Sequence, residues 1–178
     1  MMKGRHMDGE KRREEIMKLL ETEKEPLSGT ALARRLGVSR QIIVQDIALL
    51  RATNKNILST NKGYILYGKD SAAATCKRVV MVKHDNDKMA GELYCIVDAG
   101  ARVLDVIVEH EVYGQIAVDL VINSRKDVDE FMAKILSDNA RPLKELTGNV
   151  HYHTIEASDS EILDEAEKRL KEAGVLAD

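Results

Sequence analysis

Two histidines stand one residue apart in the segment GNVHYHTIEA, which has the residue pattern of a β-strand. Because side chains in a strand alternate between faces, His151 and His153 would leave the same face of a sheet. Two neutral imidazoles side by side can chelate a metal ion, whereas two protonated imidazoles repel each other. The alternative is an exposed edge strand in which histidine alternates with Tyr152. This motif alone leaves a metal site and a solvated strand equally open.

Two further candidate ligands lie earlier in the chain. His84 ends the apolar segment RVVMVKH, and Glu92 lies eight residues later within an otherwise apolar helical segment. A carboxylate on an apolar helix face needs a partner. If the helix packs over the sheet, these two residues could converge with the histidine pair into three imidazoles and one carboxylate. Such a ligand set suits nickel, zinc, iron or cobalt. A simple ion pair between His84 and Glu92 is the alternative.

The elements that must position these residues occupy the C-terminal part of the chain. Apolar periodicity and capping residues predict strands at 78–84, 102–110, 114–123 and 150–157, and helices at 85–100, 124–138 and 158–174. Ser124 and Ser158 are the predicted caps of the last two helices. The order βαββαβ followed by a helix predicts an α+β, ferredoxin-like βαββαβ(α) domain, in which the first and fourth strands come close together.

The N-terminal part has a different pattern. A helix predicted over residues 9–23 precedes EPLSGTALARRLGVSRQIIVQDIALLRATN, which has the pattern of two helices around a tight turn. Ser28 caps the first helix, Gly37 ends it in the left-handed conformation, and Ser39 caps the second. The segment NILSTNKGYILY then predicts a two-stranded hairpin. This order predicts a winged helix-turn-helix DNA-binding domain, and a helical protein-interaction module is the alternative.

Polar residues of the second helix are the predicted DNA contacts. Gln41 and Gln45 share a face with Ala48, whose small side chain permits close approach to DNA. We expect base contacts from the first turns of this helix and phosphate contacts from its end and from the tip of the hairpin. The predicted DNA-binding residues are Ser39, Arg40, Gln41, Gln45, Arg51 and Lys62.

Charge is spread unevenly over the 178 residues. Residues 1–70 hold 14 Lys and Arg against 9 Asp and Glu, whereas residues 71–178 hold 13 against 21. This asymmetry indicates a basic module for a polyanion joined to an acidic module. The predicted boundaries are a DNA-binding domain at 1–67, a linker at 68–77 and a regulatory domain at 78–178. No apolar run is long enough for a bilayer span or a signal peptide, so we expect a cytoplasmic protein without a membrane partner.

The sequence resembles the niacin-responsive transcriptional repressors (NiaR), which join a winged helix-turn-helix to a 3H domain. The resemblance covers about Lys11 to Leu176, and its markers are VSRQIIVQDIALLR, VKH, DVIVEHEVYGQI and VHYHTIEA. It implies a divalent metal, nickel or zinc, and nicotinic acid as co-repressor in the control of genes for NAD synthesis and niacin uptake. The metal ligands that it implies are His84, Glu92, His151 and His153.

His110 and Tyr113 are candidate contacts for the effector. A place in a hairpin turn explains His110 equally well. One winged domain contacts too little DNA for tight specific binding, so we expect a homodimer held by the acidic domain.

No Ser–His–acid set, phosphate-binding glycine loop or paired-carboxylate signature is present, so we expect no enzymatic activity. The competing functions are a direct nickel or zinc sensor and a metal-dependent enzyme fused to a DNA-binding domain.

Overall fold

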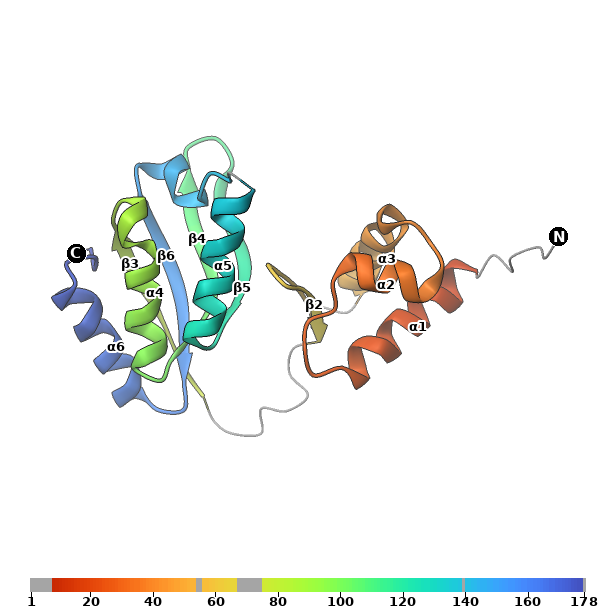
Figure 1. Ribbon diagram of the computed structural model, residues 1–178, viewed down its shortest axis with the longest axis horizontal. Coiled ribbons are helices and arrows are strands. Elements are labelled where there is room, and N and C mark those ends of the chain that lie inside the picture. Colours follow the sequence, from red (N-terminus) through yellow and green to blue (C-terminus); the bar gives the residue numbers. More distant parts are fainter. Residues whose placement is uncertain (1–7, 54–55, 67–74, 139, 178) are drawn as a thin grey trace. The chain divides into compact units, whose positions relative to one another are not determined.

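The computed structural model describes residues 8–53, 56–66, 75–138 and 140–177. The chain divides into two compact units, residues 1–70 and 71–178 (Figure 1). The predicted linker at 68–77 falls mostly outside the described residues, but Cys76 and Lys77 already belong to a strand of the second unit. The described helices include none that is both long and apolar enough to cross a membrane.

The first unit consists of three helices and a hairpin. Their bounds are α1 Gly9–Thr22, α2 Gly29–Leu36, α3 Arg40–Thr53, β1 Ile57–Thr60 and β2 Gly63–Leu66. Ser28 Oγ accepts a hydrogen bond from Ala31 N at 3.1 Å, and Gly37 adopts the left-handed conformation with φ +66°. Ser39 Oγ accepts from Ile42 N at 3.3 Å at the start of α3. The predicted caps and turn are therefore confirmed.

The core of the first unit is aliphatic, with one buried ion pair beside it. Apolar side chains from all three helices and the hairpin form the core: Ile16, Leu20, Leu27, Leu32, Ala33, Ile43, Ile47 and Ile57. Asp46 of α3 is buried and accepts hydrogen bonds from Arg12 of α1, at 2.5 Å from Nε and 3.3 Å from Nη2. Arg13 Nη1 lies 3.4 Å from the same carboxylate. This pair fixes α1 to α3.

The hairpin is tied to the loop before α2. Leu27 and Tyr64 exchange two backbone hydrogen bonds, both of 2.8 Å, so the residue before the Ser28 cap adds a bridge to β2. Gly63 has φ +140°, and a Cβ atom there would lie 2.4 Å from the Leu27 carbonyl oxygen. Only glycine allows this approach without strain. The last residue of the predicted second strand, Tyr67, lies outside the described residues.

The second unit is a four-stranded sheet with helices. Its elements are β3 Cys76–Lys83, η1 Asn86–Lys88, α4 Met89–Asp98, β4 Arg102–His110, β5 Gly114–Ile122, α5 Arg125–Ser137, η2 Leu143–Thr147, β6 Val150–Ala157 and α6 Ser160–Glu172. The strand order is β3-β6-β4-β5, with all neighbours antiparallel. Each helical crossover therefore skips one strand, which is the split βαβ arrangement. The predicted α+β class, the element order and the closeness of the first and fourth strands are confirmed.

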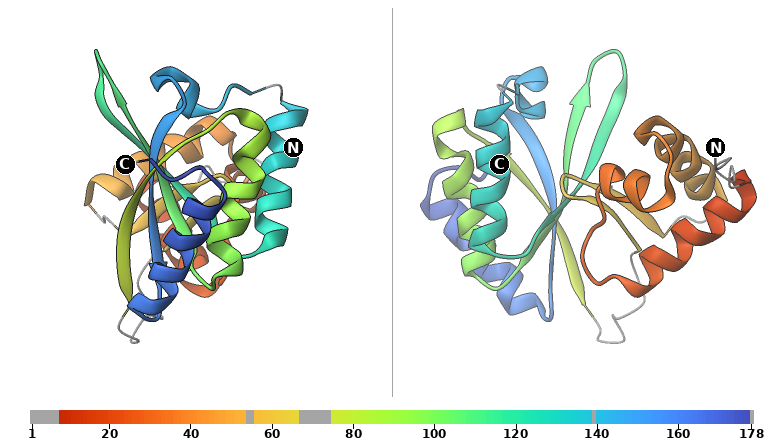
Figure 2. Two further views of the ribbon diagram at one scale, coloured as in Figure 1. Left: turned by 90° about the vertical axis from the view of Figure 1, so that its left-hand side faces the viewer. Right: turned by 45° about the vertical axis from the view of Figure 1, so that its right-hand side comes forward.

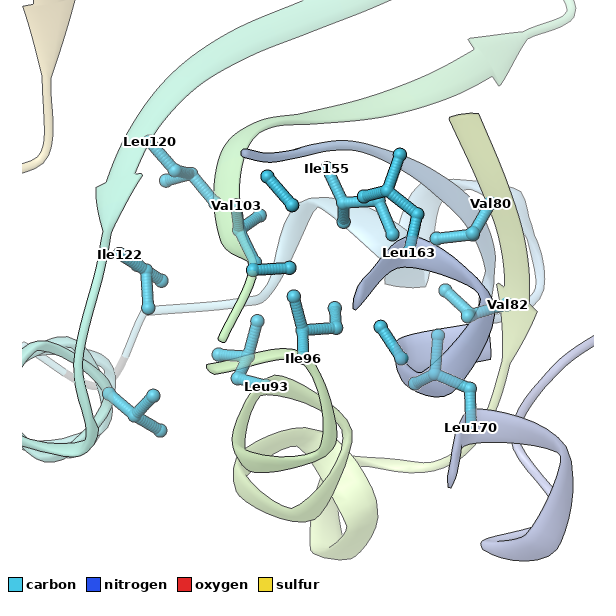
Figure 3. Close-up of a cluster of buried hydrophobic side chains, with 14 of the residues drawn as sticks. Val80, Val82, Leu93, Ile96, Val103, Leu120, Ile122, Ile155, Leu163 and Leu170 are labelled. Carbon is cyan, nitrogen blue, oxygen red and sulfur yellow. The ribbon is translucent and has the colours of Figure 1, made fainter. Parts of the chain in front are cut away.

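Helices α4, α5 and α6 cover one face of this sheet (Figure 2). The core between the layers includes Val80 and Val82 of β3, Leu93 and Ile96 of α4 and Leu163 of α6 (Figure 3). The other face of the sheet, which we term the open face, carries the alternate residues of each strand. It bears the cross-strand row Met81, Tyr152, Ile107 and Ala117. Val79, next to this row, is 59% exposed.

One local prediction is wrong, and one element was missed. Asp159, not Ser158, caps α6, because its Oδ1 accepts from Ile162 N at 3.0 Å while Ser158 Oγ donates to the Asp159 carboxylate. A carboxylate is the stronger acceptor, and it also favours the positive end of the helix dipole. The short helix η2, which lies before β6, was not predicted. It packs against β4 and β6, beside the histidine pair.

Candidate metal centre and DNA-binding surface

Four predicted ligands come from three separate elements. His84 directly follows β3, Glu92 lies in the first turns of α4, and His151 and His153 lie on the helix-covered face of β6. Strands β3 and β6 are hydrogen-bonded neighbours, and α4 follows β3 after a short 3-10 turn. The four residues are between 1% and 6% exposed. The sheet topology therefore buries three imidazoles around one carboxylate.

Glu92 lies at the centre of this group. Its Oε2 is 2.6 Å from His84 Nε2 and 3.5 Å from His151 Nε2, and its Oε1 is 3.1 Å from His153 Nε2. The His84, Glu92 and His151 ligand atoms all lie within 4.8 Å of one another. His153 does not belong to this closely spaced group, although its Nε2 faces the same carboxylate. The structure thus brings all four predicted residues together, three of them more tightly than the fourth.

The other ring nitrogen of each histidine points at a backbone carbonyl oxygen. His84 Nδ1 lies 2.7 Å from Asp85 O, His151 Nδ1 lies 3.4 Å from Asn149 O, and His153 Nδ1 lies 2.5 Å from Asp105 O. A carbonyl oxygen only accepts, so Nδ1 must carry the proton in each ring. The Nε2 atoms therefore face inward, where a proton on His84 Nε2 makes the 2.6 Å hydrogen bond to Glu92 and a deprotonated Nε2 could instead bind a metal ion. Such outer contacts orient histidine ligands in metal sites.

One oxygen of the central carboxylate has no well-formed hydrogen bond. Glu92 Oε1 is buried and lies 3.1 Å from His153 Nε2, but no hydrogen bond of good geometry reaches it from the described residues. Burial raises the pKa of Glu92, but the charge of His153 and hydrogen bonds from the three imidazoles outweigh it and hold that pKa well below its usual range. Burial lowers the pKa of His153, yet Glu92 and the Asp105 carbonyl raise it overall. Burial lowers the pKa of His151. A buried carboxylate surrounded by three Nε2 atoms fits a divalent cation once those nitrogens lose their protons.

The two candidate effector residues lie at the hairpin between β4 and β5. His110 Nδ1 accepts the backbone N–H groups of Val112 and Tyr113 at 3.2 and 3.4 Å, and the His110 and Tyr113 rings are 4.9 Å apart. No hydrogen bond or ring contact joins either residue to Glu92 or its histidines within the part of the chain that the structure describes. The observed contacts of His110 are those of a turn residue, and Tyr113 is 77% exposed.

The predicted DNA contacts lie on the outer face of α3 and at the hairpin. Arg40, Gln41, Gln45 and Ala48 are exposed, opposite the buried Ile43. Ser39, also exposed, caps the helix and so stands at its N-terminal end. Arg51 is exposed in the last turn of α3. Lys62 lies in the turn between β1 and β2, where its N–H donates to Thr60 Oγ1 at 3.1 Å. This arrangement is that of a recognition helix with a wing.

Three polar residues that support the histidine cluster or the helices of the first unit were not predicted from the sequence. The buried Lys144 of η2 donates to the His84 carbonyl, Asp105 supplies the acceptor for His153, and Asp46 holds Arg12. Lys144 and Asp46 each stand in a mixed polar segment whose periodicity does not distinguish buried from exposed. Asp105 acts through its backbone at a register shift in β4, and no side-chain pattern marks such a contact.

A winged helix-turn-helix followed by a domain that buries a histidine and carboxylate cluster defines a DNA-binding regulator. Residues 12–65 match the HTH domain family, and residues 77–178 match the 3H domain family. The chain is 44% identical over 167 residues to the probable transcription repressor NiaR of Thermotoga maritima. It is 42% identical over 171 residues to the transcription repressor NadR of Bacillus subtilis, and both alignments cover 94% of each chain.

The chain belongs to the NiaR/NadR family of transcription repressors. The predicted family, the helix-turn-helix and 3H domains and the absence of an enzymatic role are confirmed by these relatives. The protein is therefore a transcription repressor that binds operator DNA, and the alternative of a metal-dependent enzyme is set aside.

Proposed function

We propose that the protein represses genes of NAD synthesis and niacin uptake, with nicotinic acid as co-repressor on a divalent metal, nickel or zinc. One observation carries the proposal. Three buried imidazoles donate outward to backbone carbonyls and turn their Nε2 atoms toward the single carboxylate of Glu92. Once those nitrogens lose their protons, a bound cation can take the place of the protons between them and the carboxylate.

His84, Glu92, His151 and His153 would hold the ion. Four protein ligands on an octahedral metal leave two positions for water or another ligand. When bound, the ion supplies a Lewis-acidic position that a ring nitrogen can occupy. The protein's own contribution is to bury the ligands, to fix their tautomers and to keep Glu92 ionised. Binding requires the proton of His153 to leave, so metal affinity should rise with pH.

Nicotinic acid matches such a centre chemically. Its pyridine nitrogen can take a metal position, and its carboxylate can accept charge-assisted hydrogen bonds that the amide of nicotinamide accepts less well. To act as co-repressor, the acid must bind the DNA-competent state more tightly than the alternative state. A coupling of about 1–3 kcal/mol changes operator affinity by roughly 5- to 150-fold. The sequence resemblance to niacin-responsive repressors supports this choice of ligand.

We also propose that two copies bind a palindromic operator and associate through the open face of the sheet. A partly exposed row of apolar side chains, with the exposed Val79 beside it, on an uncovered sheet face is typical of an interface. Lys77 and Lys83 lie on β3 at one side of this face, and Glu109 and Asp119 lie on β4 and β5 at the other. A two-fold axis parallel to the strands would place β3 of one copy over β5 of the other, so that opposite charges meet.

A direct metal sensor without organic effector is the second candidate. It is favoured by the burial of the four residues, which are at most 6% exposed, because a metal ion needs less opening of the site than an aromatic acid does. In that case metal occupancy alone would control operator binding.

One titration separates the two candidates. Operator affinity of the metal-free chain is measured with nickel alone, with nicotinic acid alone and with both. The co-repressor proposal expects tightening only with both, and no effect of nicotinamide with nickel. Full tightening by nickel alone supports the direct sensor, and tightening by nicotinic acid without metal contradicts both.

A further inference from the structure

Lys144 is a buried cation that no carboxylate of the described residues contacts in an ion pair. It is 2% exposed, and its Nζ donates to His84 O at 2.8 Å and to Asn149 Oδ1 at 3.1 Å. Both acceptors are neutral, and no ion pair of Lys144 occurs among the described residues. An ammonium has three N–H donors, so two neutral contacts leave one donor over. A buried charge without a counter-ion is costly and calls for an explanation.

The Lys144 ammonium lies at the edge of the candidate metal centre. Its first acceptor is the carbonyl of His84, and its second is the side chain of Asn149, two residues before His151. Asn149 is held in place because its Nδ2 donates to Asp85 Oδ1 at 2.9 Å. The backbone of Asn149 has φ +69°, a conformation that needs support from its surroundings. The ammonium is thus fixed against the two segments that carry His84 and His151.

The acidic groups nearby do not neutralise Lys144 by contact. The Asp85 carboxylate accepts a hydrogen bond from Asn149 Nδ2, and the Glu145 carboxylate accepts one from Asn86 Nδ2. Glu92 is itself committed to the imidazoles. A further anion that enters the centre would therefore find a prearranged, partly desolvated cation, where a charge-assisted hydrogen bond is strongest.

We infer that the Lys144 ammonium binds the carboxylate of a small aromatic acid whose ring nitrogen lies at the metal centre. This inference rests on the proposed function and adds the residue that selects an acid over its amide. An acid brings the missing negative charge to Lys144, whereas an amide leaves the ammonium unpaired. The contacts with His84 and Asn149 hold the ammonium in position before the ligand arrives, so little ordering is needed on binding.

The test measures binding of nicotinic acid and of nicotinamide to the nickel-loaded full chain by calorimetry. Wild type is expected to prefer the acid, and Lys144→Met to lose about 10- to 100-fold in affinity for the acid, the worth of one charge-assisted hydrogen bond. Its affinity for nicotinamide should stay the same. Lys144→Arg should keep the preference for the acid. The exposed Lys88→Met, which removes the same charge from η1, should bind both compounds as wild type does.

Each outcome decides one point. If Lys144→Met weakens the acid and the amide alike, Lys144 only braces His84 and the inference is wrong. It is equally wrong if affinity for the acid does not change. If wild type binds neither compound, the proposed co-repressor function fails instead. If Lys144→Met loses its nickel, the ratio of affinities for nicotinic acid and nicotinamide is measured in Lys144→Gln instead. The glutamine amide can still donate to the His84 carbonyl but carries no charge.

Discussion

Substitution of Asp46 by alanine should remove most of the stability of the DNA-binding unit. Asp46 is 3% exposed and Arg12 is 9% exposed, and two hydrogen bonds join them. Alanine at position 46 removes the carboxylate that two hydrogen bonds join to the buried Arg12 guanidinium, and breaking a buried pair from one side costs about 3–5 kcal/mol. A unit of this size has a total stability of roughly 4–10 kcal/mol. Its unfolding midpoint should therefore fall by at least about 12 °C.

Calorimetry of the full chain provides the assay and an internal control. The transition of the 3H domain should stay in place in Asp46→Ala while that of the DNA-binding unit moves, because the ion pair lies wholly within residues 8–53. The double variant Arg12→Met with Asp46→Leu should recover most of the loss, since apolar side chains can replace a buried pair. An unshifted transition in Asp46→Ala, or a double variant no more stable than the single one, would refute the reasoning.

Three further predictions concern the wing, the metal centre and DNA. Gly63→Ala should destabilise the first unit by more than about 2 kcal/mol in urea unfolding, because the added Cβ would lie 2.4 Å from the Leu27 carbonyl oxygen. The control Gly91→Ala, whose Cβ meets no atom within 4 Å, should instead stabilise α4 by about 0.5–1 kcal/mol. Because the pKa of His153 is raised, its contribution to the stability of metal-free protein is lost as pH rises above about 6.5, whereas the contribution of bound nickel grows. Thermal melts of metal-free and nickel-loaded protein with equal pH slopes would contradict this. Gln41→Ala should weaken binding to operator DNA by about 1–3 kcal/mol without changing binding to random DNA. Lys62→Ala should weaken binding to both and lower the slope of log affinity against log salt concentration by about one.

Local signals in the sequence account for most of the fold. Ser28, Gly37 and Ser39 mark the two helices and the turn because caps and left-handed glycines depend on nearest neighbours, and the structure has each of them as expected. His151 and His153 could be assigned to one face because the period of a strand is two. The order of elements also predicted that the first and fourth strands lie close together, which brings the two histidines near His84. The position of Glu92 beside them depends on how α4 packs over the sheet, which the order of elements does not fix.

Long-range polar contacts could not be predicted. Asp46 meets Arg12 across 34 positions, and Lys144 meets His84 across 60. Neither pair follows from propensity or periodicity, since a single charged residue in an amphipathic segment has the same pattern whether it is buried or solvated. The helix η2 is too short to show a period, which left Lys144 unassigned. The cap of α6 was misassigned because Ser158 and Asp159 are adjacent and both residue types cap helices.

The most direct test of the metal centre is the metal content of purified variants by elemental analysis. We expect one nickel or zinc ion per wild-type chain and nearly none in His153→Ala, which removes one of the four proposed ligands. His110→Ala is the matched control, since it removes an imidazole whose observed contacts lie within its own hairpin. It should keep a full ion. Undiminished metal in His153→Ala, or equal loss in both variants, would contradict the assignment of this centre.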